Sequence, residues 1–129
     1  MNHTSKLTVR VDPDESAEIK GSALELEHLA ALFREASDTI AVVDVISVGR
    51  TPVDAIAVRR VSTMAMIQIR YSDRALRVEG AKENLGILAD NVSYAASAGC
   101  DGSHIHIEHY DEHPYLDAQS LPLIISRDP

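Results

Sequence analysis

The chain has 129 residues, of which 45% are apolar and 4% aromatic, so a single domain can fill a core made mostly of aliphatic side chains. Twenty acidic and twelve basic residues give a net charge of −8, which opposes binding to phosphate backbones and argues against nucleic acid as a direct partner. The single cysteine provides neither an internal disulfide nor a cysteine zinc cluster. No signal-peptide core and no apolar run of the roughly 18 residues needed for a membrane span are present. We therefore expect one cytoplasmic domain over residues 1–129, without a membrane partner.

A β-hairpin is predicted at the start of the chain. LTVRV (7–11) alternates apolar and polar residues, DPDES (12–16) is rich in turn-forming residues, and AEIKG (17–21) supplies a return strand that ends at a glycine.

A helix over about 22–36 follows this hairpin. Ser22 with Glu25 three positions later matches a capping box, which satisfies free amides at a helix start. One apolar face of this helix is formed by Leu26, Leu29, Ala30 and Phe33. Two β-branched segments, 39–48 and 55–61, then predict further strands on either side of a Gly and Pro turn.

The second half of the chain repeats this pattern. Leu7, Gly21 and Leu29 correspond to Ile67, Gly80 and Leu88, with a hairpin connection that is one residue shorter in the second copy. The repeat predicts a helix over about 81–97, followed by strands at 104–110 and 121–127. We expect pseudo-repeats over about 5–62 and 63–129, each with the plan ββαββ. The simplest arrangement is an α+β two-layer sandwich, a mostly antiparallel sheet with two helices on one face.

The segment HIHIEHYDEH (104–113) is the strongest candidate for chemistry. Alternation in a strand places His104, His106 and Glu108 on one face and the two isoleucines between them on the other. Imidazole and carboxylate are familiar ligands of divalent metals, and a further ligand could come from His109, Asp111 or His113. The alternative is that this polar row is the solvent-exposed face of a sheet whose other face packs on helices.

The acidic connection that follows, HYDEHPYLDAQ (109–119), is longer than a hairpin turn needs. Aromatic side chains flanked by charge are common where proteins bind one another. The segment therefore predicts partner-binding residues, with an exposed loop that binds nothing as the alternative: Tyr110, Asp111, Glu112, Tyr115 and Asp117.

Taken together, the elements of the second half resemble a known family. A glycine after a strand, a helix containing NLGILADNV, the strand HIHIEHY, a polar connection and then SLPLIIS are similar to the immunity protein 32 family of bacterial polymorphic toxin systems, over about residues 66–127. The resemblance implies a protein that binds and neutralises a cognate toxin inside the producing cell, and it supplies no catalytic residues.

From this resemblance we expect a non-enzymatic inhibitor whose partner is a cognate protein toxin, bound through an acidic surface, with no cofactor. The alternative function is a small enzyme that uses a divalent metal held by His104, His106 and Glu108. A homodimer is left open as a further kind of partnership.

Overall fold

The computed structural model describes residues 7–61, 66–97, 104–110, 113 and 115–128. Asp111 and Glu112, two of the predicted partner-binding residues, lie outside the described residues. The described residues form two helices, α1 (Ala23–Arg34) and α2 (Lys82–Ser97). Their strands are β1 (Thr8–Asp12), β2 (Ser16–Gly21), β3 (Ala41–Asp44), β4 (Ile46–Ser47), β5 (Ala55–Arg60), β6 (Gln68–Ser72), β7 (Ala75–Gly80), β8 (His104–Ile107) and β9 (Leu123–Arg127).

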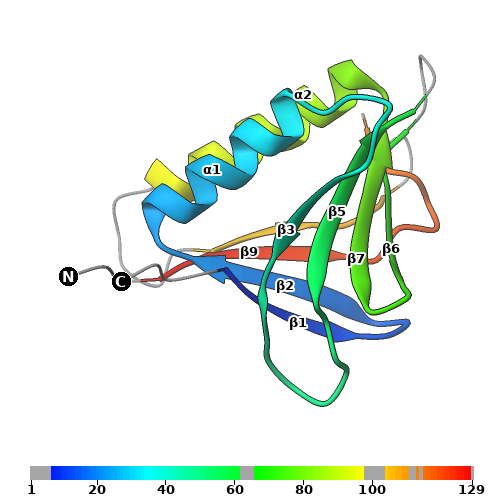
Figure 1. Ribbon diagram of the computed structural model, residues 1–129. Helices are drawn as coiled ribbons and strands as arrows, with labels where there is room; N and C mark the ends of the chain where they lie inside the picture. Colours follow the sequence, from blue (N-terminus) through cyan, green and yellow to red (C-terminus); the bar gives the residue numbers. More distant parts are fainter. Residues whose placement is uncertain (1–6, 62–65, 98–103, 111–112, 114, 129) are drawn as a thin grey trace.

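The predicted α+β class with two helices is confirmed, whereas the sheet differs from the expected one. The strands form two mixed sheets: sheet A has the order β4-β1-β2-β9-β8, and sheet B has the order β3-β5-β7-β6. In the middle of each sheet two strands run parallel, β2 with β9 and β5 with β7. Figure 1 shows α1 and α2 side by side above sheet A, with the strands of sheet B rising steeply beside them.

The two halves of the chain exchange partners between the sheets. Hairpin β1–β2 of the first half pairs with β9 of the second half, and hairpin β6–β7 of the second half pairs with β5 of the first. Sheet order β1-β2-β9-β8 therefore corresponds to β6-β7-β5-β3 when the halves are interchanged. Each parallel pair joins strands that are not consecutive in the chain, as parallel pairing requires, because a tight hairpin turn can connect only antiparallel strands.

Matched positions of the two halves also have matched hydrogen bonds. Asp128 donates its backbone N–H to the carbonyl of Gly21 at 2.7 Å, and Val61 donates to the carbonyl of Gly80 at 3.0 Å. This agreement is what a duplication would produce. The duplication itself stays a prediction that superposition of the two halves would test.

The core lies between the helix pair and the two sheets. The capping box at the start of α1 is confirmed, since the Ser22 hydroxyl accepts from the Glu25 N–H at 3.1 Å and the Glu25 carboxylate accepts from the Ser22 N–H at 2.9 Å. The predicted apolar stripes are buried, with Leu29 at 2% and Leu88 at 0% exposure. Burial of these stripes, rather than helix propensity alone, stabilises the two helices.

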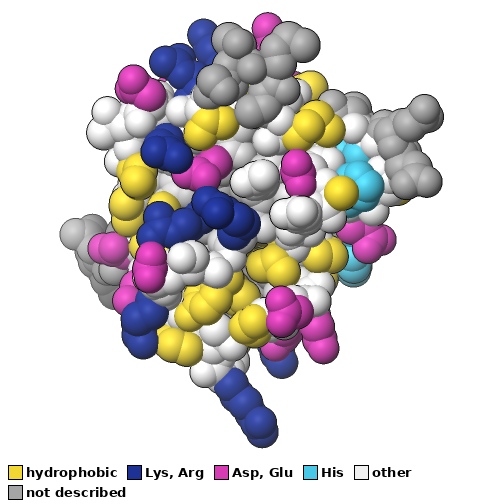
Figure 2. Space-filling view, turned by 90° about the vertical axis from the view of Figure 1, so that its right-hand side faces the viewer, with side chains coloured by type: hydrophobic (Ala, Val, Ile, Leu, Met, Phe, Trp, Pro, Cys, Tyr) yellow, Lys and Arg dark blue, Asp and Glu magenta, His cyan; other side chains and the backbone are white. Residues whose placement is uncertain are grey.

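The outer face of sheet B carries charges of both signs (Figure 2). Glu79 on β7 accepts from Arg59 at 2.8 Å and from Arg70 at 2.9 Å. In the β6–β7 turn, Arg74 contacts Asp54 at 2.9 Å. These arginines are neutralised by neighbouring carboxylates, so the face does not present a continuous basic surface.

Candidate partner-binding surface

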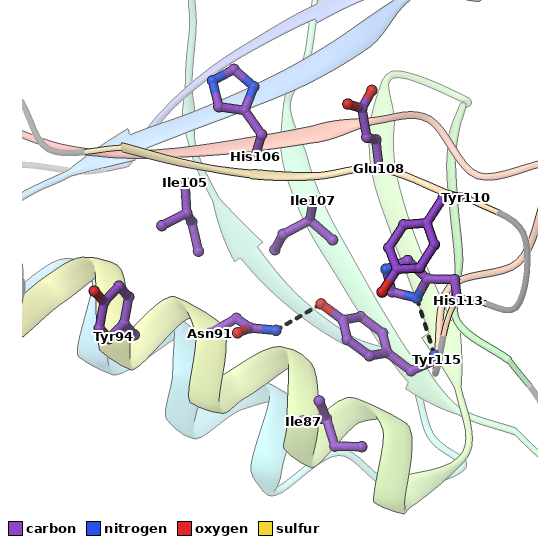
Figure 3. A pocket seen from close by; sticks show the side chains of 10 residues that line it. All are labelled: Ile87, Asn91, Tyr94, Ile105, His106, Ile107, Glu108, Tyr110, His113 and Tyr115. Atoms are coloured by element: carbon purple, nitrogen blue, oxygen red, sulfur yellow. Dashed lines mark hydrogen bonds between the residues drawn. The ribbon is translucent and has the colours of Figure 1, made fainter.

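Strand β8 places its side chains as the alternation predicted. His104, His106 and Glu108 are exposed, while Ile107 is only 5% exposed. Figure 3 shows Ile105 and Ile107 pointing toward α2, and His106 and Glu108 on the opposite side of the strand. The isoleucines therefore belong to the helix-facing layer of sheet A, and the polar row belongs to its outer face.

The predicted metal ligands lie near one another but do not converge. The rings of His104 and His106 meet edge to face with centroids 5.0 Å apart. Among the described residues, no group of three or more His, Cys, Asp or Glu side chains is placed to hold a metal ion. Asp111, one candidate for a further ligand, lies outside the described part of the chain, so the metal site stays a prediction.

A groove of about 660 Å³ lies between α2 and β8 (Figure 3). Helix α2 contributes one wall, β8 contributes another, and the segment after β8 closes one end. None of the described side chains that line the groove is a Lys or Arg. They are Ile87, Asn91, Tyr94, Ile105, His106, Ile107, Glu108, Tyr110, His113 and Tyr115.

His113 organises the segment that closes the groove. Its Nδ1 accepts the backbone N–H groups of Tyr115 at 3.1 Å and of Leu116 at 3.0 Å. The backbone N–H of His113 donates to the Tyr110 carbonyl at 2.9 Å. The centroid of its ring lies 4.7 Å from that of Tyr110 and 4.6 Å from that of Tyr115. Because Nδ1 is an acceptor, the neutral imidazole carries its proton on Nε2.

Burial has opposite consequences for the two titratable groups in this cluster. Burial lowers the pKa of His113 below its ordinary value, and nearby His109 lowers that pKa further. Burial raises the pKa of Tyr115, with the hydrogen bond from Asn91 acting in the other direction. Both shifts favour the uncharged form. The Tyr115 hydroxyl accepts from the Asn91 amide at 2.7 Å and so joins the segment to α2.

The rest of the acidic connection is held along the edge of β6. The Ile67 N–H donates to the Tyr115 carbonyl at 2.7 Å, and the Asp117 N–H donates to the Ile67 carbonyl at 2.8 Å. The Ser120 hydroxyl donates to the Ile67 carbonyl at 2.9 Å and accepts from the Ile69 N–H at 3.0 Å. Residues 115–121 thus extend sheet B along this edge, which a hairpin turn would be too short to do.

The predicted partner-binding residues occupy different environments. Tyr110 is 59% exposed, and Asp117 is partly exposed, with its carboxylate accepting from the Gln119 N–H at 2.8 Å. Tyr115 is only 4% exposed, so it supports the segment from beneath and offers little surface to a partner. The roles of His113 and Ser120 were not predicted, because their partners are backbone groups whose positions a sequence pattern does not reveal.

The second half of the chain, which contains this surface, also has a known counterpart. Residues 75–128 match the Immunity protein 32 family. The match runs from β7 through α2 and β8 to β9, and it confirms the resemblance predicted for the second half. No curated protein and no solved structure matches the chain. In the part of the chain that the structure describes, no helix is long and apolar enough to cross a membrane.

Proposed function

We propose that the chain is an immunity protein that binds and neutralises a cognate protein toxin in the cytoplasm and has no enzymatic activity of its own. The observation that carries this proposal is the match of residues 75–128 to the Immunity protein 32 family. The matched range includes the groove and the whole segment between β8 and β9. In this proposal the chain inhibits by covering the toxin.

The proposed toxin-binding surface comprises the exposed Tyr110 and the partly exposed Asp117, together with Asp111 and Glu112, which are included from the sequence alone because they lie outside the described residues. Two features support it. The bonds of His113 and the pairing with Ile67 hold Tyr115 and Asp117 in place, which lowers the entropic cost of binding. The net charge of −8 would attract a basic toxin and speed its association.

Asp117 offers a clean test of this surface. The Asp117→Asn variant keeps an oxygen that can accept from the Gln119 N–H but removes the charge. We expect its association rate with the toxin to fall about 2- to 10-fold at low salt and to depend less on ionic strength, because long-range attraction weakens. Stopped-flow mixing at two salt concentrations measures both effects, and the thermal midpoint should stay within roughly 2 °C of the wild type.

The matched control is Asp44→Asn. Asp44 is exposed on β3, at the opposite end of sheet B from β6, and should leave the association rate nearly unchanged. Equal slowing by both variants would show that only net charge matters and would contradict the assigned surface. The function itself is tested by co-expression with the toxin: cells that gain no protection from the wild-type chain would refute the immunity proposal.

The metal-dependent enzyme remains the alternative hypothesis, based on His104, His106 and Glu108. Elemental analysis of protein purified without chelators distinguishes the two functions. Stoichiometric zinc, iron or manganese that is lost in a His106→Ala variant would favour the alternative.

A further inference from the structure

Among the described residues sheet A ends at β8, and α2 packs on β8 and β9 at this edge. Ile87, Asn91 and Tyr94 follow one another at spacings of four and three residues and so form a stripe on one face of α2. This stripe lies beside the helix's fully buried stripe and faces the groove, next to Ile105 and Ile107 (Figure 3). Ile87 is 42% and Tyr94 66% exposed, and with the isoleucines of β8 they line one groove, as apolar side chains at an interaction site do.

The groove has the position that one more strand would occupy. Within the described residues β9 is the only strand hydrogen-bonded to β8, so the other edge of β8 ends the sheet. A strand added there would lie roughly 4.8 Å from β8 and would pack its inward side chains against the α2 stripe.

We propose that this edge is a homodimer interface, in which β8 pairs antiparallel with β8 of a second copy across a two-fold axis and sheet A continues from one subunit into the other. The sequence of β8 is self-complementary in one register. Centred on His106, the pairing sets Ile105 against the partner's Ile107 on the helix-facing side. On the outer face it sets His104 against the partner's Glu108, an imidazole beside a carboxylate. This complementarity favours a second copy over an unrelated strand.

The helices fit the same two-fold axis. Helix α2 packs on β8 and β9, so two symmetry-related copies would be about two strand spacings apart, roughly 10 Å, which is a normal distance between packed helices. Asn91 lies between Ile87 and Tyr94 along α2, below Ile105 and Ile107 (Figure 3). An antiparallel pair of α2 helices centred near Asn91 sets Ile87 against the partner's Tyr94 and covers both apolar side chains.

The corresponding edge of the first half is β3 in sheet B, and it does not combine an unpaired strand with an exposed apolar stripe on the neighbouring helix. On β3 the outward residues include Val42, which is 60% exposed, so that edge also offers apolar surface. The α1 positions that match Ile87 and Tyr94 in the repeat are His28 and Glu35, which are polar and exposed. The position that matches Asn91 is Leu32, which is packed against the core, and α1 makes few contacts with β3, so the edge at β3 lacks an exposed apolar helix stripe beside it.

Sedimentation equilibrium of the full chain tests this proposal. We expect a dimer at micromolar concentration, and the Tyr94→Lys variant should raise the dimer dissociation constant at least about 10-fold because it places two like charges in the covered groove. The control is Leu24→Lys on α1, since Leu24 and Tyr94 are both 66% exposed. Leu24→Lys should leave the dissociation constant unchanged, and both variants should keep the wild-type circular dichroism.

Several results would overturn the homodimer. The homodimer is refuted if the wild-type chain stays monomeric up to about millimolar concentration, because a specific dimer associates more tightly than that. Equal effects of Tyr94→Lys and Leu24→Lys would place the dimer contact elsewhere. If the wild-type chain is monomeric and the Tyr94→Lys variant no longer inhibits the toxin, this edge binds the toxin. The homodimer proposal would then be wrong while the immunity proposal stands, so the two proposals fail separately.

A cysteine on the axis tests the register directly. In a Cys100→Ser background, His106→Cys places the thiols of the two copies opposite one another, where an interchain disulfide forms readily on oxidation. The control His104→Cys sets the two thiols about 13 Å apart, four residues along the strand, beyond disulfide reach. We expect near-complete cross-linking of the first variant and little of the second. Equal cross-linking would overturn the proposed register.

Discussion

At the scale of single residues, His113 fixes the conformation of the surface proposed to bind the toxin. Its Nδ1 accepts two backbone N–H groups that would otherwise point into a partly buried turn. Protonation of that nitrogen would remove both bonds and place a charge between two aromatic rings. The conformation therefore requires the neutral ring, in agreement with the lowered pKa of His113.

This requirement predicts a pH dependence of stability. Because the pKa of His113 is lower in the folded state than the ordinary 6.5, its contribution to stability is complete above that value and is lost as the pH falls through the folded-state pKa. The His113→Asn variant keeps an acceptor near the Nδ1 position but does not titrate. Urea unfolding at about pH 7.5 and pH 5 should therefore show a smaller loss of stability in the variant than in the wild type.

The matched control for this prediction is His28→Asn on the exposed face of α1, which should lose as much stability as the wild type between the two pH values. At the higher pH the His113→Asn variant should be destabilised by no more than about 1 kcal/mol, since one acceptor replaces another. A wild-type pH dependence in His113→Asn would contradict the assigned role.

Two glycines at equivalent positions of the repeat show how residue-level packing differs between the halves. A Cβ at Gly80 would lie 2.8 Å from Ile67 Cγ1 and 3.1 Å from Ile67 Cα, whereas at Gly21 the nearest atom, 2.6 Å away, is the terminal Cδ2 of Leu7. The backbone at Ile67 cannot move easily because it pairs with Tyr115 and Asp117. The Leu7 side chain can rotate away.

Alanine substitutions should therefore have graded effects. We expect Gly80→Ala to lower the free energy of unfolding by about 1–3 kcal/mol, and Gly21→Ala to lower it by less. Gly86 lies within α2 and has nothing within 4 Å of a built Cβ, so Gly86→Ala should raise it by about 0.5–1 kcal/mol through helix propensity. Denaturant unfolding of the three variants measures their free energies of unfolding and so tests this order. A Gly21→Ala loss as large as that of Gly80→Ala would contradict the steric argument.

At the scale of elements, the sequence predicted most helices and strands because their determinants are local. The capping box at Ser22 and the apolar stripe that follows it place α1 within two residues of its observed bounds. The turn between β6 and β7 was predicted to be one residue shorter than its counterpart. Its two residues, Asp73 and Arg74, both have positive φ, as a tight two-residue hairpin requires.

The connection after β8 could not be predicted in the same way. Its polar residues suggested an exposed loop, but Leu116 bridges Ile67 in parallel, and Ser120 bonds to the same strand. The first half has a matching contact, since the Ile46 N–H of β4 donates to the carbonyl of Leu7, which corresponds to Ile67. The sequence could not reveal either pairing, because both join backbone groups far apart in the chain.

At the scale of the whole molecule, the repeat explains why the sheet partners were not predicted. Ile19 on β2 pairs with Ile125, and Val78 on β7 pairs with Val58. Since these residues have nearly the same size and apolar character, each hairpin could pair equally well with the strand of either half. Local pattern cannot choose between such equivalent partners, and the choice rests on how the helices and connections pack as a whole.

This exchange makes the family-matched half dependent on the other half. The central parallel pair of each sheet joins one half to the other, and α1 bonds to α2 through Arg34 and Asp90 at 3.0 Å. Residues 66–129 alone would lose β5 beside β7 and β2 beside β9, so both hairpins would expose apolar faces and unpaired backbone groups. We therefore expect this fragment to be unfolded on its own.

Mixing the fragment 66–129 with residues 1–61 should restore the native circular dichroism and a single cooperative unfolding transition, because residues 1–61 supply β2 and β5. The Leu88→Ala variant of the fragment is the control, since deleting a fully buried side chain costs about 2–5 kcal/mol and should weaken reassembly strongly. A Glu83→Ala variant on the exposed side of α2 should reassemble normally. If residues 66–129 unfold cooperatively from a native-like spectrum without the other fragment, the halves are independent and the exchanged pairing does not hold the fold together.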